Sequence, residues 1–313
     1  MILRCSFRGL FRTAMALLII SEAAIPQGTS APASLSSSSP RDGHPETQSG
    51  LELLNQVITN QKKSDETLDT YERIERVEIR KNGSDPQPSE VRIARVIPTG
   101  VGFDHIPVDA DGKPVDAAAY GVELEKLAKV LAWTMENGRP QRDAYDKFAK
   151  RRKDRNELID ATRTAFFYTF VAREPRAGHL LAKYSIEPNP AFKSTSRLMT
   201  IFTKVKGFVW IDEEARELAR VEGEVTGDIS IGLFLGKVYK GSHFMQERYE
   251  IKPGVWLPTF SQYDFDGRKF LASFSIHERT FFSNYRLLGP PKETLAAIQK
   301  ELGHTASSSP ADP

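Results

Sequence analysis

The sequence predicts an α+β protein that is mainly β, built on a strongly curved antiparallel sheet or partial barrel. Two observations lead to this prediction. From residue 164 onward, strand-like segments follow one another with short, turn-rich connections, and these leave no room for the crossover helices that parallel strands require. Residues 117–162 have a helical composition instead. A curved sheet that packs against two helices accommodates both features.

The first 24 residues have the layout of a secretory signal peptide. Three arginines come first, followed by an apolar run from Ala14 to Ile20 and by small residues that allow cleavage after Ala23 or Ala24. The apolar run is far shorter than the roughly 20 residues that cross a bilayer. We therefore expect export of the mature chain. The single cysteine, Cys5, precedes the apolar run, so a lipid anchor is not indicated.

Residues 25–49 are rich in Ser, Pro, Ala and Gly and carry no hydrophobic period, which predicts a disordered Ser/Pro-rich tether. The next 241 positions, 50–290, are of ordinary length for one domain with a substantial core. We expect a single domain there, with a helical insert at about 117–162. A short helix and a disordered tail are expected over 291–313.

The formal charge of the whole chain is +2. The arginines of the signal peptide, set against Glu22, account for this excess, so the mature chain is neutral. A neutral balance gives no support to a nucleic-acid partner. The basic run at 147–155 is a local exception, and it fits either a solvated helix face or a contact with an anionic membrane.

The domain is expected to open with an amphipathic helix, because Leu54 and Ile58 fall on one helical face. Two strands are expected next, over 71–80 and 91–97. Between them residues 82–86 read NGSDP, and this composition predicts a hairpin with one face in water.

The helical insert is divided by Gly138 and Pro140, which break its apolar period. Two helices are therefore expected inside a β-rich chain. They could plug the concave face of the sheet, or they could form a movable lid over it.

Eight strand-like segments follow the insert, at 166–171, 180–186, 198–211, 218–225, 232–243, 245–251, 256–265 and 269–279. Residues 264–267 read DFDG between two aromatic-bearing segments. An Asp-Gly pair in this position predicts a hairpin turn.

The sequence contains no spacing that predicts catalysis or metal binding. Residues 227–232 miss the G-x-S-x-G pattern of a serine hydrolase by one position. None of the six histidines has a second histidine at zinc-site spacing, and the DxDG turns lack the closing glutamate of a calcium loop. We expect no cofactor, no metal and no enzymatic activity. A hydrolase would require Ser230 to meet a histidine and an acid.

Four motifs occur in order between residues 206 and 288, namely GFVWID at 207–212, RVE at 220–222, KGS at 240–242 and WLP at 256–258. In this order they resemble the outer-membrane lipoprotein-sorting (LolA/LolB-like) superfamily, and in particular its uncharacterised periplasmic members. The resemblance implies an unclosed antiparallel β-barrel wrapped around helices, located in the periplasm. It also implies an apolar cavity that takes up acyl chains.

Under this resemblance the protein is a monomeric carrier or binding protein for a lipid or an acylated lipoprotein, with a cavity beneath its helices. The candidate cavity-wall residues are aromatic side chains of the expected strands: Phe167, Trp210, Phe234, Trp256 and Phe260. The same residues could instead fill an ordinary core. A second hypothesis is a sensor or regulatory module of the cell envelope that binds a membrane-protein partner and has a filled interior.

Overall fold

The computed structural model describes residues 45–196, 198–231, 236–269 and 272–307. The predicted signal peptide, most of the predicted tether, Phe234 and the last residues of the chain lie outside these ranges. Within them, no helix is both long enough and apolar enough to cross a membrane.

Twelve strands form one sheet. Their bounds are β1 Tyr71–Arg80, β2 Glu90–Pro98, β3 Phe103–Pro107, β4 Phe166–Arg176, β5 His179–Pro188, β6 Val205–Asp212, β7 Glu217–Val225, β8 Ile229–Ile231, β9 Gly236–Val238, β10 His243–Lys252, β11 Val255–Lys269 and β12 Ala272–Leu287. The helices are α2 Pro45–Leu68, α3 Ala117–Thr134, α4 Arg139–Ala165 and α5 Pro291–Ser307, with a 3-10 helix, η1, at Met199–Lys204.

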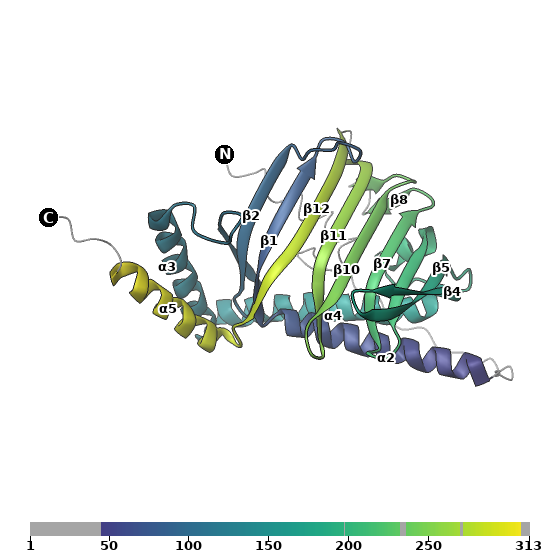
Figure 1. The fold of residues 1–313 in the computed structure, drawn as a ribbon, viewed down its shortest axis with the longest axis horizontal. Helices are drawn as coiled ribbons and strands as arrows, with labels where there is room; N and C mark the ends of the chain where they lie inside the picture. Colours follow the sequence, from purple (N-terminus) through teal and green to yellow (C-terminus); the bar gives the residue numbers. More distant parts are fainter. Residues whose placement is uncertain (1–44, 197, 232–235, 270–271, 308–313) are drawn as a thin grey trace.

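The strand order is β3-β2-β1-β12-β11-β10-β7-β6-β5-β4, and the short β8–β9 pair joins β11 through β9. Every neighbouring pair is antiparallel. The sheet is not closed, because β3 and β4 lie at its two ends (Figure 1). The predicted α+β class and the unclosed antiparallel sheet are therefore confirmed.

The helices cover different parts of the sheet. The long helices α2 and α4 cross one face of it, whereas α3 and α5 lie together beside the β1–β3 end (Figure 1). We call the face that α2 and α4 cover the inner face and the opposite one the outer face. The helix α2 begins at Pro45, five residues before the predicted start of the domain. The helices α3 and α4 occupy the region of the expected insert.

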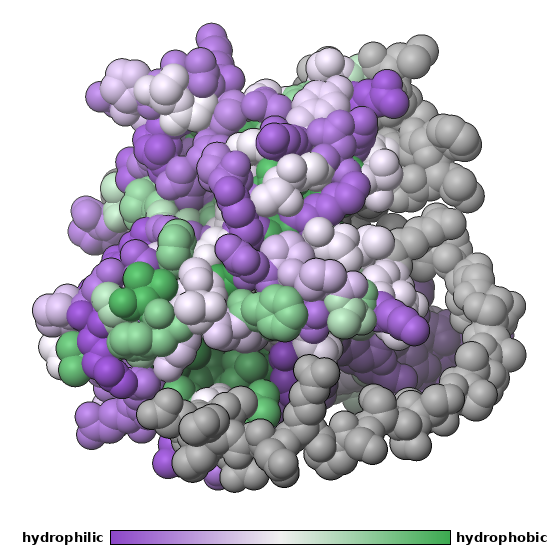
Figure 2. All heavy atoms as spheres, turned by 90° about the vertical axis from the view of Figure 1, so that its right-hand side faces the viewer, coloured by the Kyte–Doolittle hydropathy of each residue, from purple (hydrophilic) through white to green (hydrophobic). Residues whose placement is uncertain are grey.

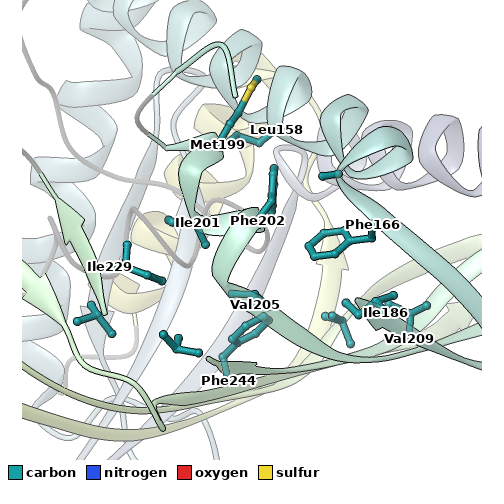
Figure 3. Packing of buried hydrophobic residues seen from close by; sticks show 14 of the residues in the cluster. Leu158, Phe166, Ile186, Met199, Ile201, Phe202, Val205, Val209, Ile229 and Phe244 are labelled. Carbon is teal, nitrogen blue, oxygen red and sulfur yellow. The ribbon is translucent and has the colours of Figure 1, made fainter. Parts of the chain in front are cut away.

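The inner face of β6, β7, β10 and β11 packs against the helices through one apolar cluster, which occupies the place where sequence analysis expected a cavity beneath the helices. Val57 of α2 and Leu158 of α4 meet side chains from these strands, and Figure 3 shows Leu158, Phe202 and Val205 gathered between α4 and the sheet. The inward residues alternate along each strand, as the pleat of a sheet requires. They include Val205 and Val209 on β6, Val221 and Val225 on β7, Phe244 on β10, and Tyr263 and Phe265 on β11.

Buried charges hold the helices beside that cluster. Asp65 of α2 pairs with Arg248 of β10 and lies 3.4 Å from Nε of Arg155 on α4. All three side chains are buried. One carboxylate therefore joins α2, α4 and the sheet.

The predicted hairpin is confirmed, because β11 and β12 pair in antiparallel, but its turn does not lie at 264–267. These residues continue β11, which pairs with β12 as far as Lys269 and Ala272. Glycine at 267 allows β9 to approach β11 closely and does not form a turn. A Cβ atom there would lie 2.1 Å from the carbonyl oxygen of Lys237. The expected strand at 198–211 is also wrong in its first half, because η1 buries Met199 and Phe202 in the apolar cluster.

Candidate functional site

The outer face carries a groove of about 500 Å³ across β5, β6, β7, β10 and β11. Most of its lining residues alternate along their strands with members of the inner apolar cluster, which places the groove opposite α2 and α4, whereas Ile186 and Phe244 belong to both sets. We call it the outer groove. Its lining residues are Ser185, Ile186, Glu187, Lys206, Gly207, Phe208, Glu222, Gly223, Glu224, His243, Phe244, Met245 and Gln262.

The lining of the groove mixes apolar side chains with polar and charged ones. Phe208 is 37% exposed and Met245 is partly exposed. Glu222 of β7 lies between them and is the cross-strand neighbour of both. Lys206 and His243 add polar groups to the lining. An apolar chain with a polar end can contact both kinds of surface at once.

Three of the predicted wall residues lie around the outer groove. Phe167 is 55% exposed and pairs with Glu187, which lines the groove. The rings of Trp210 and Phe208 are 6.0 Å apart. Phe260 lies two residues before Gln262 on the same face of β11. The structure thus brings Phe167, Trp210 and Phe260 to the outer face, although none of them belongs to the lining.

The other two predicted wall residues are placed differently. Trp256 is buried in a small cluster with Trp210, Leu181 and Ala219, and its ring lies 5.0 Å from that of His179. Phe234 lies outside the described residues. Sequence reasoning missed Phe208 and Met245, although Phe208 could have been found because it precedes Trp210 by the two-residue period of a strand.

Charged side chains fix Trp210 and its surroundings. The indole Nε1 of Trp210 donates a hydrogen bond of 2.8 Å to Glu174, and this bond is the main cause that lowers the pKa of the Glu174 carboxyl. Arg220 and Lys183 lie 4.9 and 4.8 Å from the Trp210 ring. Lys183 also lies 4.7 Å from the ring of Phe208. Such contacts order the aromatic wall before any ligand binds.

The β4–β5 end of the sheet carries exposed apolar side chains beside the groove. Figure 2 looks onto this end and shows hydrophobic side chains gathered there. The exposed large apolar residues of β4 and β5 are Phe167, Phe170, Val171 and Leu180. In the described part of the chain, β4 is the last strand at this end of the sheet. This end therefore offers a second apolar surface.

The described ranges contain no group of three or more His, Cys, Asp or Glu side chains that could hold a metal ion. Ser230, the serine that sequence analysis considered for a hydrolase, lies exposed on β8 opposite Lys237. It does not belong to the outer groove.

No model of a protein family matches this chain, and no curated protein matches it. A similar solved structure is the crystal structure of a DUF1329 family protein from Desulfovibrio piger, with 9% sequence identity and a TM-score of 0.27. The match covers 77% of this chain and 92% of that chain. A likeness this weak carries no argument about family or function, so the lipoprotein-sorting resemblance stays a prediction.

Proposed function

We propose that this protein is an exported binding protein that holds an acyl chain of a lipid or lipoprotein in the outer groove. The observation that carries the proposal is the apolar wall of Phe208 and Met245 inside a groove of about 500 Å³. Small-molecule sites typically measure about 300–1,000 Å³ and combine apolar walls with a few polar groups. Binding, rather than catalysis, is the task we assign to this groove.

The energetics favour an elongated apolar ligand. Each CH₂ group that leaves water contributes about 0.8 kcal/mol, so several methylenes along Phe208 and Met245 give useful affinity. The polar end of such a ligand would remain near Lys206 and His243, which line the same groove. A charged head group needs no burial in this arrangement.

The N-terminal sequence supports the cell compartment that we propose. A basic segment, a short apolar run and small residues near Ala23 are the features of a cleaved signal peptide. Together with the resemblance to lipoprotein-sorting proteins, they support a periplasmic location. A monomer is enough for this function, because the groove is formed by one chain.

A partner-binding module is the second candidate, and the exposed apolar end of the sheet favours it. Phe167, Phe170 and Leu180 are each about half exposed. An edge strand such as β4 can pair with an extended segment of another protein. A membrane-protein partner would then dock on this end, and the outer groove would stay empty.

The test begins with the mature protein purified gently from a bacterial periplasm. Native mass spectrometry followed by lipid extraction identifies any bound lipid, and titration with a fluorescent fatty-acid analogue measures uptake. We expect a co-purifying lipid that the probe displaces.

A pair of variants locates the binding. Phe208 and Phe281 are both 37% exposed on the outer face, but only Phe208 lines the groove. Loss of one apolar wall residue corresponds to about 1.5–3 kcal/mol, so Phe208→Arg should weaken probe binding about tenfold or more. Phe281→Arg should leave it unchanged. An empty protein that ignores the probe would overturn the proposal, as would equal effects of the two variants.

A further inference from the structure

Three polar side chains of the outer face form a hydrogen-bonded chain beside the outer groove. Oγ of Ser275 lies 2.8 Å from Nε2 of His277, and Nδ1 of His277 lies 3.0 Å from Oδ1 of Asp264. Ser275 and His277 are two residues apart on β12 and therefore share a face. Asp264 is the direct cross-strand partner of His277 on β11.

We propose that this cluster is a hydrolytic site in which Ser275 attacks an ester, His277 is the general base and Asp264 is a positioning residue. A serine nucleophile needs a base within about 2.6–3.2 Å and a third group that orients the base. Both distances fall in this range. The two ring nitrogens of His277 are also used in the order that the chemistry requires, since Nε2 faces the hydroxyl and Nδ1 faces the carboxylate.

The neighbouring backbone protects and orders the base. A Cβ atom on Gly83 would lie 2.8 Å from Oδ1 of Asp264 and 2.9 Å from Nδ1 of His277. The β1–β2 connection therefore covers the hydrogen bond between these two side chains, and the His277 side chain is only 11% exposed. Gln262 donates a hydrogen bond of 2.5 Å to the other oxygen of Asp264. Asp264 is thus held from two sides.

The outer groove leads to this cluster. Gln262 and His243 line the groove, and His243 is the cross-strand partner of Asp264. A chain lying along Phe208 and Met245 would bring its polar end toward β11 and β12. The assignment of an acyl ester as the substrate rests on the function proposed above, whereas the assignment of the nucleophile does not.

The reaction balances with water as the only co-reactant. Oγ of Ser275 bonds to the ester carbonyl carbon while its proton passes to Nε2 of His277. The carbon–oxygen bond to the alcohol then breaks, and His277 returns the proton to the leaving alkoxide. Water attacks the acyl-serine with the same base, which releases the carboxylic acid and restores Ser275. Arg268 lies on the same face of β11 two residues beyond Asp266, the cross-strand partner of Ser275, and we assign it to the developing oxyanion.

Asp266 competes with His277 for the hydroxyl proton of Ser275 and therefore affects the reactivity of this serine. The Ser275 hydroxyl also hydrogen-bonds to the Asp266 carboxylate, and a hydroxyl has a single proton to donate. Nucleophilic attack requires that this proton go to Nε2 of His277. Removal of the competing acceptor by Asp266→Ala should therefore raise the reactivity of Ser275.

The experiment treats the full mature protein with a fluorophosphonate probe and maps the labelled residue by mass spectrometry. We expect labelling of Ser275 that is lost in Ser275→Ala and retained in Ser273→Ala, which removes the exposed serine two residues away on the same strand face. His277→Gln should slow labelling about 100-fold or more, because general-base catalysis contributes about 10²–10⁴-fold. Circular dichroism and urea unfolding establish that each variant is folded.

Two outcomes overturn the inference. One is the absence of labelling at Ser275 in the folded protein, and the other is labelling at Ser275 that His277→Gln leaves unchanged. A comparison of long-chain esters with acetate esters as substrates distinguishes the hydrolytic site from the proposed binding function. Hydrolysis of long-chain esters that falls in Phe208→Arg, with acetate esters unaffected, supports both. Labelling of Ser275 together with long-chain ester hydrolysis that Phe208→Arg leaves unchanged overturns the acyl-ester assignment, whereas acyl binding without labelling of Ser275 overturns the hydrolytic site alone.

Discussion

Asp65 of α2 and Arg248 of β10 form an ion pair whose side chains are 1% and 2% exposed. This contact joins the long N-terminal helix to the middle of the sheet. Removal of Arg248 leaves the buried Asp65 carboxylate with Arg155 alone, 3.4 Å away, and breaking a buried ion pair typically destabilises a protein by about 3–5 kcal/mol. We expect a loss of this size in the free energy of unfolding for Arg248→Ala, measured by urea denaturation. Lys62→Ala is the control, because Lys62 of the same helix pairs with Asp160 of α4 at the surface, and such pairs contribute about 1 kcal/mol or less. Similar losses in both variants would contradict the expectation.

Stability should decrease as the pH rises through the range from 4.5 to about 7, owing to Glu217. Burial raises the pKa of this carboxyl from 4.5 to about 7, against the nearby charges of Arg248 and Lys63. The unfolded chain releases this proton near pH 4.5, whereas the folded protein keeps it until about pH 7, so folding is accompanied by proton uptake between these values. The contribution of Glu217 to the free energy of unfolding is therefore complete below pH 4.5 and is lost above about pH 7.

Urea unfolding at a series of pH values checks this, with Glu217→Gln as the comparison. Between pH 4.5 and 7, the free energy of unfolding should fall less steeply with pH in the glutamine variant, because the contribution of Glu217 is removed. Asp69, whose pKa burial raises to about 6, titrates in both proteins and cancels in the difference. Identical slopes would show that Glu217 does not bind the extra proton.

Two glycines should respond to alanine in opposite ways. A Cβ atom at Gly223 would lie 2.2 Å from the ring of Phe244, whereas one at Gly121 on α3 meets nothing within 4 Å. Overpacking in a core costs about 1–3 kcal/mol, and alanine is favoured over glycine inside a helix by about 1 kcal/mol. Gly223→Ala should therefore lower the thermal midpoint and Gly121→Ala should raise it. A stabilising Gly223→Ala would show that Phe244 can move away at little cost.

The hydroxyl of Tyr120 should hold α5 in place. It donates a hydrogen bond of 2.8 Å to Glu301 of α5 and accepts one of 2.5 Å from Arg95 of β2. Tyr120→Phe keeps the ring and removes both bonds, and we expect a loss of about 1 kcal/mol. In this variant, amide hydrogen exchange should become faster in α5 than in the unmodified protein and should change less in the central strands. Tyr145→Phe, at an exposed position of α4, should change neither quantity.

The local pattern was sufficient to predict the helical pair but not all of its limits. Leu124, Leu127 and Leu131 are fully buried on α3, as their spacing predicts. Met135 continues that spacing in the sequence, yet it follows the last residue of α3 and is exposed. Helical periodicity identifies a buried face, whereas the end of a helix depends on capping contacts.

Pairing between strands that are distant in sequence determined the features that the sequence did not predict, namely the position of the β11–β12 turn and the register of the two strands. The DFDG sequence at 264–267 has the composition of a turn, but β9 packs beside Gly267 and keeps it in a strand. The Ser275–His277 spacing of two could have been recognised as one face of a strand. Asp264 could not have been added to that pair, because the register between β11 and β12 depends on where the chain turns.

The pairing of β1 with β12 joins opposite ends of the described chain, since Tyr71 lies beside Leu287. The middle of the sheet is therefore incomplete until almost the whole chain has been synthesised. Contacts this distant in sequence slow folding, because a large loop must close before they can form. A chain that folds this slowly stays unfolded for longer after its synthesis, which would suit the export that we propose.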